Sequence, residues 1–116
     1  MKWSDLDSDK CPIARSLSVV GDRWTLLILR DCFVGNTRFD AFQKSLGLTR
    51  HLLADRLAKL VNAGVLKKEP YAKGRYDYRL TTQGKALAPV LSHLFDWGKE
   101  NVPRTEMASG EREAHT

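Results

Sequence analysis

The 116 residues include 19 Lys and Arg against 14 Asp and Glu, a net charge of +5, and 42% of them are apolar. This length and composition predict one small globular domain that needs no disulfide or metal to fold. No apolar run approaches the ~20 residues that span a bilayer, and the N-terminus lacks the apolar segment of a signal peptide, so we expect a cytoplasmic protein with no membrane role.

Motifs of common enzymes and metal sites are absent from the sequence. The two cysteines, Cys11 and Cys32, are 21 positions apart, and neither has a Cys or His at zinc-site spacing. No nucleophile elbow, P-loop or dinucleotide-binding motif occurs. We therefore expect a protein that is not an enzyme and has no catalytic residues, metal or cofactor.

Positive charge is concentrated in the middle of the chain. Residues 38–85 carry 11 basic and 4 acidic side chains and hence a charge of +7, whereas residues 1–37 are neutral and residues 86–116 carry −2. Such a segment can be an ordinary solvated face, but on a suitable scaffold it is typical of a phosphate-binding surface.

The first predicted elements are a flexible N-terminus over residues 1–10 and two short helices. Pro12 favours the first position of a helix, so Cys11 is the predicted N-cap of a helix that reaches about Val20 and ends at Gly21. Asp22 is the predicted N-cap of a second helix that reaches about Phe33.

A turn and a third helix follow. Residues 34–37 predict the turn, and apolar spacing predicts a helix over 39–46 that Gly47 ends.

The fourth predicted helix has the clearest pattern. Thr49 is its N-cap and Gly64 follows its C-terminus. Leu53, Leu57 and Leu60 form one apolar stripe, and the opposite face is mixed and polar.

Two strands are predicted next, over residues 65–69 and 75–81, with a loop over 70–74 between them. In the second strand Tyr76, Tyr78 and Leu80 alternate with Arg75, Asp77 and Arg79. This period of two indicates a half-buried hairpin with a cationic outer face and tip, in which the tyrosines pack inward.

A long helix is predicted from Thr82 to about Asn101. Pro89 lies inside it and predicts either a kink or a first turn that is offset from the rest. The polar residues 102–116 are expected to form a disordered tail.

This order of elements is that of a winged helix-turn-helix, which is mainly α with a small β-hairpin (α+β). In that fold the helix over 49–63 would lie in a DNA major groove, and the hairpin, or wing, would contact phosphates or an adjacent minor groove. Residues 11–101 would form this DNA-binding and dimerisation domain.

A set of short motifs between residues 11 and 101 is more specific than the order of elements. It consists of Cys11-Pro12, the segment GDRWTLLILRD at 21–31, Arg38-Phe39, the segment LLADRL at 52–57 with Gly64, and YRLT at 78–81 with Gly84. With these motifs the chain resembles the HxlR-type family of bacterial transcription regulators, which are relatives of MarR proteins. Many members have Gly-Gly-Lys where this chain has Gly-Asp-Arg, a change expected to alter the local surface but not the fold.

The resemblance implies a homodimer that binds an inverted-repeat operator, usually represses neighbouring genes and dimerises through its terminal helices. The last predicted helix also carries more large apolar side chains than a small monomer needs, although they could simply cover its core. The candidate dimer-interface residues are Leu87, Leu91, Leu94, Phe95 and Trp97.

Candidates for contacts with double-stranded DNA lie around the fourth helix and the wing. Arg and His can hydrogen-bond base edges, short polar side chains can reach phosphates, and wing cations can neutralise phosphates. For Arg56 an internal ion pair, with an acid such as Asp55 or Asp31, is a nearly equal alternative. The candidates are Arg38, Thr49, Arg50, His51, Ala54, Asp55, Arg56, Lys68, Lys73, Arg75 and Arg79.

Cys11 is the candidate redox-sensing residue. A thiol at a helix N-terminus, close in sequence to Lys10 and Arg15, favours the reactive thiolate. Some HxlR-type regulators use a cysteine at this position to sense oxidants or electrophiles, although Cys11 could also be a passive cap. Cys32 is expected to be a buried core residue, and an intersubunit disulfide between the two cysteines stays open.

The sequence thus predicts a sequence-specific DNA-binding regulator, a cytoplasmic and nucleoid-associated homodimeric repressor that responds to an oxidant or electrophile through Cys11. One alternative is a winged-helix module whose basic face binds an acidic protein partner. Another is a regulator that responds to a small-molecule ligand without thiol chemistry.

Overall fold

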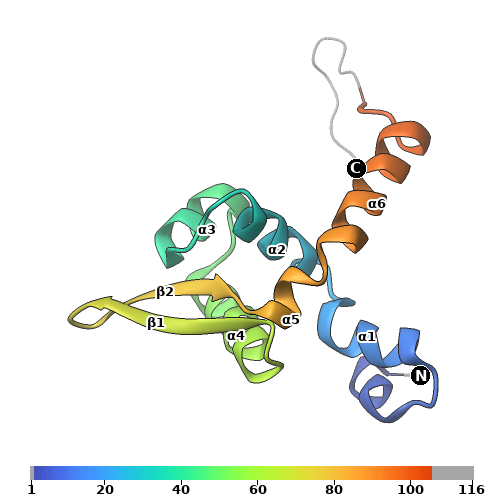
Figure 1. Ribbon diagram of the computed structural model, residues 1–116. Helices are drawn as coiled ribbons and strands as arrows, with labels where there is room; N and C mark the ends of the chain where they lie inside the picture. Colours follow the sequence, from blue (N-terminus) through green and yellow to red (C-terminus); the bar gives the residue numbers. More distant parts are fainter. Residues whose placement is uncertain (1, 106–116) are drawn as a thin grey trace.

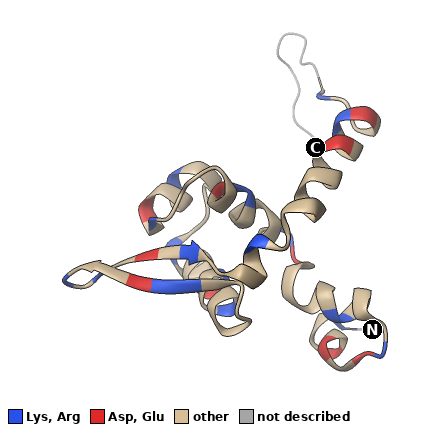
Figure 2. Ribbon diagram, in the orientation of Figure 1, with Lys and Arg blue, Asp and Glu red and all other residues tan. Residues whose placement is uncertain are grey.

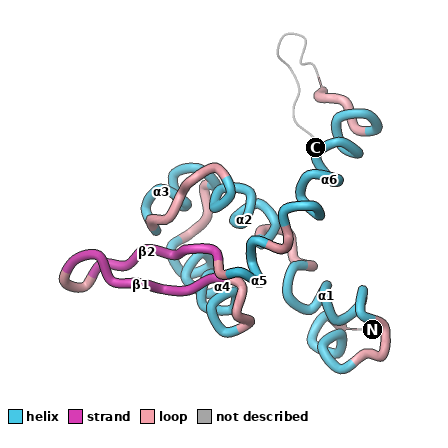
Figure 3. The backbone as a smooth tube through the Cα atoms, in the orientation of Figure 1, coloured by secondary structure: helices cyan, strands magenta, loops and turns pink. Residues whose placement is uncertain are grey.

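The computed structural model describes residues 2–105, in which helices pack around the base of one projecting hairpin and the last helix extends away from this body (Figure 1). The elements in chain order are the 3-10 helix η1 (Trp3–Ser8), α1 (Pro12–Val20), α2 (Thr25–Phe33), α3 (Phe39–Leu46), α4 (Arg50–Asn62), β1 (Leu66–Ala72), β2 (Arg75–Leu80), α5 (Thr82–Lys85) and α6 (Ala88–Asn101). Figure 3 shows the short loops that join them.

Local capping signals set the bounds of α1, α3 and α4, as predicted. Pro12 occupies the first turn of α1, and Gly21 caps the C-terminus of that helix. Gly47 ends α3 in the left-handed conformation, with a φ of 71°. The Thr49 hydroxyl accepts a hydrogen bond from the Leu52 amide at 3.2 Å and so caps α4, and Gly64 follows that helix with a φ of 81°.

The start of α2 differs from the prediction by two residues. Trp24, not Asp22, is the N-cap. The Asp22 carboxylate still accepts a hydrogen bond from the Trp24 amide at 3.1 Å and another from the Thr25 hydroxyl. Asp22 therefore anchors the start of α2 from outside the helix, through the amide of the N-cap residue and the hydroxyl of the first helical residue.

The core lies between α2, α3, α4 and the first residues of β1. Leu53, Leu57 and Leu60 of α4 are at most 1% exposed, which confirms the predicted apolar stripe. They pack with the other buried apolar residues, which are Ile28, Leu29, Phe42, Leu48, Val65 and Leu66. This packing fixes which face of α4 is left for solvent.

The prediction of a loop over residues 70–74 is wrong. β1 continues through Pro70, which pairs with Tyr76, to Ala72, which pairs with Arg75. Only Lys73 and Gly74 turn the chain, and Gly74 has a φ of 69°. Pro70 is tolerated because β1 is an edge strand of a two-stranded sheet.

The prediction of which β2 side chains face inward and which face outward is also wrong in part. Asp77 is only 5% exposed, whereas Tyr76 is 40% exposed. The chain just before α3 covers Asp77, because Arg38 pairs with it as an isolated bridge and the Tyr78 amide donates to the Thr37 carbonyl at 2.8 Å. Tyr78 packs partly buried against the core, as expected.

The two ends of the chain carry further helices. Pro89 lies in the first turn of α6, and α5 forms a separate turn before it, so the offset alternative is the one observed. The sequence did not predict η1, which packs on α1 and whose Trp3 Nε1 donates to the Leu17 carbonyl at 2.6 Å.

Some expectations about the ends stay untested. The flexibility of residues 1–10 remains a prediction, and most of the predicted tail, residues 106–116, lies outside the described residues. Within residues 2–105 no helix is long and apolar enough to cross a membrane.

Candidate nucleic-acid interface

A groove of about 570 Å³ lies between the starts of α3 and α4 and the outer part of the hairpin. Its lining includes three of the predicted contact residues, Arg38, Arg50 and Arg75, together with Tyr71 and Tyr76. Lys and Arg colour both strands and the tip of the hairpin in Figure 2. The fold thus brings cations from three separate segments to one face.

Arg50, the first residue of α4, is held in place by α3. Its Nη1 lies 3.1 Å from Asp40 Oδ1 and 3.2 Å from Gln43 Oε1, and its guanidinium carbon lies 4.5 Å from the centre of the Phe39 ring. The side chain remains largely exposed. It is therefore oriented in advance, yet free to exchange these surface partners for others.

The neighbouring predicted contacts on α4 have different surroundings. His51 and Ala54 are exposed. The Thr49 hydroxyl is engaged in the N-cap hydrogen bond. Asp55 accepts from Arg56 at 2.5 Å and lies 3.7 Å from Lys59 Nζ.

Arg56 makes the internal ion pairs that were one of its two alternatives. Its Nη1 contacts Asp55, and its Nε lies 2.7 Å from Asp22 Oδ2, a partner that the sequence did not predict. Asp31, the other expected partner, pairs with Arg30 instead. The Arg56 side chain is 18% exposed and that of Asp22 is 8% exposed, so this pair is a structural link between α4 and the segment before α2.

Burial alone would raise the pKa of Asp22. The hydrogen bonds from Thr25, Arg56 and the Trp24 amide outweigh burial and hold the pKa of Asp22 below its ordinary value.

The wing cations are all exposed, but some of them contact other side chains of the hairpin. Lys68 Nζ lies 4.4 Å from the centre of the Tyr76 ring. Arg79 contacts Asp77 at 3.1 Å and Glu69 at 3.5 Å. Lys73 and Arg75, at the tip, are exposed. These two residues are the best placed of the wing cations to meet an external anion.

Asp77 is the centre of the polar contacts beneath the wing. Its carboxylate accepts from Arg38 Nε at 2.5 Å, from the Thr37 hydroxyl at 3.0 Å and from Arg79 Nη2 at 3.1 Å. The Arg38 hydrogen bond is the main reason that the pKa of Asp77 is held below its ordinary value. Sequence reasoning missed this role, although a single acid between arginines in a basic hairpin is a usable signal.

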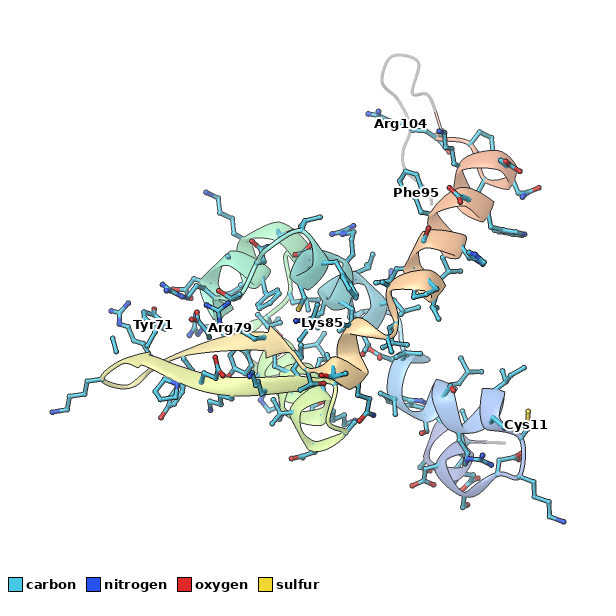
Figure 4. All side chains as sticks on the ribbon, viewed as in Figure 1. Cys11, Tyr71, Arg79, Lys85, Phe95 and Arg104 are labelled. Atoms are coloured by element: carbon cyan, nitrogen blue, oxygen red, sulfur yellow. The ribbon has the colours of Figure 1, made fainter. Side chains whose placement is uncertain are left out.

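The two cysteines differ in exposure. Cys11 is exposed, its amide donates to Asp9 Oδ1 at 2.9 Å, and it lies far from the hairpin residues Tyr71 and Arg79 (Figure 4). Cys32 is partly buried and packs against the core. Burial, with the nearby Asp31 charge, raises the pKa of Cys32 to about 12, so its thiolate is suppressed.

Arg15 orders the loop that carries Cys11. Its Nη1 donates to the carbonyls of Asp9 and Lys10 at 2.8 and 2.7 Å.

The predicted dimer-interface residues fall into two groups. Leu87 and Leu91 pack partly buried against the monomer core. Leu94, Phe95 and Trp97 are 48%, 68% and 61% exposed, and Phe95 projects from α6 in Figure 4. The sequence missed two exposed apolar residues of α1, Ile13 and Leu17. Both terminal helices thus present apolar surface that residues 2–105 do not cover.

Among residues 2–105 no group of three His, Cys, Asp or Glu side chains could hold a metal ion.

Comparison with known proteins identifies a family and several related transcriptional regulators. The family model described as HxlR-like helix-turn-helix matches residues 19–106. The HTH-type transcriptional regulator Rv3095 of Mycobacterium tuberculosis is 43% identical over 96 residues, which cover 81% of this chain and 61% of that protein. YdeP of Bacillus subtilis, also an HTH-type transcriptional regulator, is 30% identical over 97% of this chain and 90% of its own. The chain therefore spans about three fifths of the mycobacterial relative.

Solved structures share the fold. PA1607, a proposed transcription factor, superimposes with a TM-score of 0.83 at 42% identity over 97% of this chain and 75% of its own. The redox regulator HypR in its reduced form gives 0.75 at 26% identity over 80% of this chain and 95% of its own.

Proposed function

Because this chain belongs to the HxlR-like helix-turn-helix family, we propose that it is a transcriptional regulator that binds double-stranded DNA through α4 and the wing. One observation carries the proposal: the exposed start of α4 and the cations of the wing flank the same groove. A major groove admits an α-helix, while a wing beside it can reach the phosphates.

The contacts divide by chemistry. Arg50 and His51, at the start of α4, would meet base edges, and a guanidinium can bond both acceptors of a guanine. Lys73 and Arg75 would meet phosphates, with Lys68, Arg79 and Arg38 adding positive charge around them. Ala54 would face a base at van der Waals distance. Arg56 and Asp55, which pair with each other, would hold α4 in place instead of reading bases.

The protein would act as a homodimer. A second copy of the chain is the occupant that best fits the uncovered apolar faces of α1 and α6, because two-fold symmetry would bury both faces at once. It would also set two copies of α4 about 34 Å apart, one turn of DNA. The operator would then be an inverted repeat, and occupation of a promoter would repress the gene beside it.

Cys11 would be the sensing thiol. HypR, a redox regulator, shares this fold at 26% identity. Cys11 is exposed, whereas the pKa of Cys32 is raised to about 12, so an oxidant or electrophile would react with Cys11 first.

The test is binding of the purified protein to DNA from upstream of its own and neighbouring genes, at two salt concentrations, against a scrambled sequence. We expect tight binding to a palindrome that weakens steeply with salt, because each phosphate contact adds about 0.9 to the logarithmic slope. Equal, weak binding to all sequences would contradict the proposal and favour the protein-interaction module.

A further inference from the structure

Tyr71 and Arg38 lie against each other where the wing meets the groove. The guanidinium carbon of Arg38 is 3.4 Å from the centre of the Tyr71 ring. Tyr71 is the β1 residue without a cross-strand partner, because the register shifts between Pro70 and Ala72. Such a bulge re-aims a side chain away from the regular strand pattern, and here the ring covers an arginine.

Arg38 contacts both strands of the wing from outside the hairpin. Its Nε bonds Asp77 of β2, its guanidinium stacks on Tyr71 of β1, and its backbone forms the N-cap position of α3. Arg38 therefore connects the outer half of the wing to the helix that precedes α4.

The outer half of the wing has little else to hold it. Leu66 and Leu80 pack the base of the hairpin on the core, but residues 70–76 are all exposed. An isolated two-stranded hairpin is marginally stable in water. A stacked cation and a buried carboxylate are the contacts that can fix this segment relative to the helices.

We propose that Arg38 and Tyr71 are positioning residues that fix the angle of the wing to α3 and α4, so that the tip cations and α4 engage DNA together. This inference rests on the proposed DNA binding for its functional part. Its structural part concerns the free protein and can be tested without DNA.

Hydrogen exchange of the free protein tests the structural part. Tyr71→Ala is expected to speed hydrogen exchange of the β2 amides by roughly fivefold. The effect should be greatest at the Tyr78 amide, which donates to the Thr37 carbonyl. Tyr71→Phe keeps the ring and should exchange like the unaltered protein. Tyr76→Ala is the matched control, since Tyr76 is also 40% exposed but stacks on Lys68. Unchanged exchange in Tyr71→Ala would overturn the proposal.

The salt dependence of DNA binding tests the functional part. Tyr71→Ala removes no charge, yet a displaced wing should neutralise fewer phosphates, so the slope of log affinity against log salt should fall by about 0.9 for each phosphate that the wing no longer reaches. Tyr71→Phe should keep the original slope. Weaker binding with an unchanged slope would show that Tyr71 touches DNA directly and would overturn the positioning role. If the unaltered protein binds no DNA, the proposed function fails, and hydrogen exchange alone decides the positioning.

Discussion

Arg56 of α4 and Asp22, which precedes α2, form an ion pair across 34 positions of sequence, with Nε and Oδ2 separated by 2.7 Å. Both side chains are mostly buried, and Asp22 also accepts a hydrogen bond from the amide of Trp24, the N-cap residue of α2. The pair therefore joins α4, the proposed recognition helix, to the segment just before α2.

Removing either partner of this pair should destabilise the protein. Asp22→Asn and Arg56→Ala are each expected to lower the free energy of unfolding by about 1–3 kcal/mol, less than for a fully buried pair because Arg56 keeps some contact with water. The double variant should lose less than the sum of the two. Urea unfolding at a fixed protein concentration would measure this, and strictly additive losses would show that the two residues do not interact.

Acid should weaken the protein through Asp22 and Asp77, whose pKa values are both lowered by folding. Lowered values mean that the unfolded chain binds protons more readily, so this stability is present at neutral pH and is lost as pH falls below about 4, through the folded-state pKa values. Asp77→Asn should be less stable at pH 7 and lose less on acidification. Unfolding midpoints measured between pH 7 and pH 3 would test this, and parallel curves for the two proteins would contradict it.

Arg50 and Arg75 should contribute to DNA binding in different ways. Arg50→Ala is expected to relax the base preference at one operator position and to cost about 1–3 kcal/mol there, because alanine cannot bond a base edge. Arg75→Ala should weaken all sequences alike and reduce the salt slope by about 1. Titrations of a panel of operator variants at several salt concentrations separate the two behaviours. Uniform weakening by Arg50→Ala would assign it to phosphate.

Phe95 offers the most direct test of dimerisation. Phe95→Asp places a charge in the apolar surface of α6 and should convert the proposed homodimer to a monomer that binds a full operator weakly. Val34→Asp is a matched control, because Val34 is 78% exposed but lies outside the terminal helices. Sedimentation velocity gives the oligomeric state of each. A Phe95→Asp protein that remains dimeric would exclude this part of α6 from the interface.

Cys11 should determine the response to oxidant. Diamide removes two electrons and two protons from two thiols, joining Cys11 either to a second protein cysteine or to a small thiol such as glutathione. We expect diamide with glutathione to release the DNA from the unaltered protein and from Cys32→Ser, but not from Cys11→Ser. Release from Cys11→Ser would place the signal elsewhere and favour a ligand-responsive regulator.

Local signals in the sequence predicted most of the helices, and non-local contacts account for what was missed. The helix Phe39–Leu46, the N-cap Thr49 and the glycine that follows α4, Gly64, were predicted from neighbouring residues alone. The burial of Asp77 depends on residues 37–38, some forty positions earlier. Alternation within β2 could not show that this segment would cover one of its polar residues.

The sequence predicted where the basic residues of the candidate site lie along the chain, but not how they are arranged in space. The basic segment 38–85 does supply the cations around the groove. Its sequence does not show which cations are already paired, as Arg56 is with Asp22, or that Tyr71 stacks on Arg38.

The course of α6 has a mechanical consequence. Its first turns pack on the core through Leu91, its later turns leave that core, and its 14 residues make a rod about 21 Å long. In the proposed homodimer a 10° swing of this rod about its base would displace its far end by about 4 Å. A small rearrangement among the terminal helices would then change the distance between the two copies of α4. The two copies could no longer contact both half-sites of the operator at once.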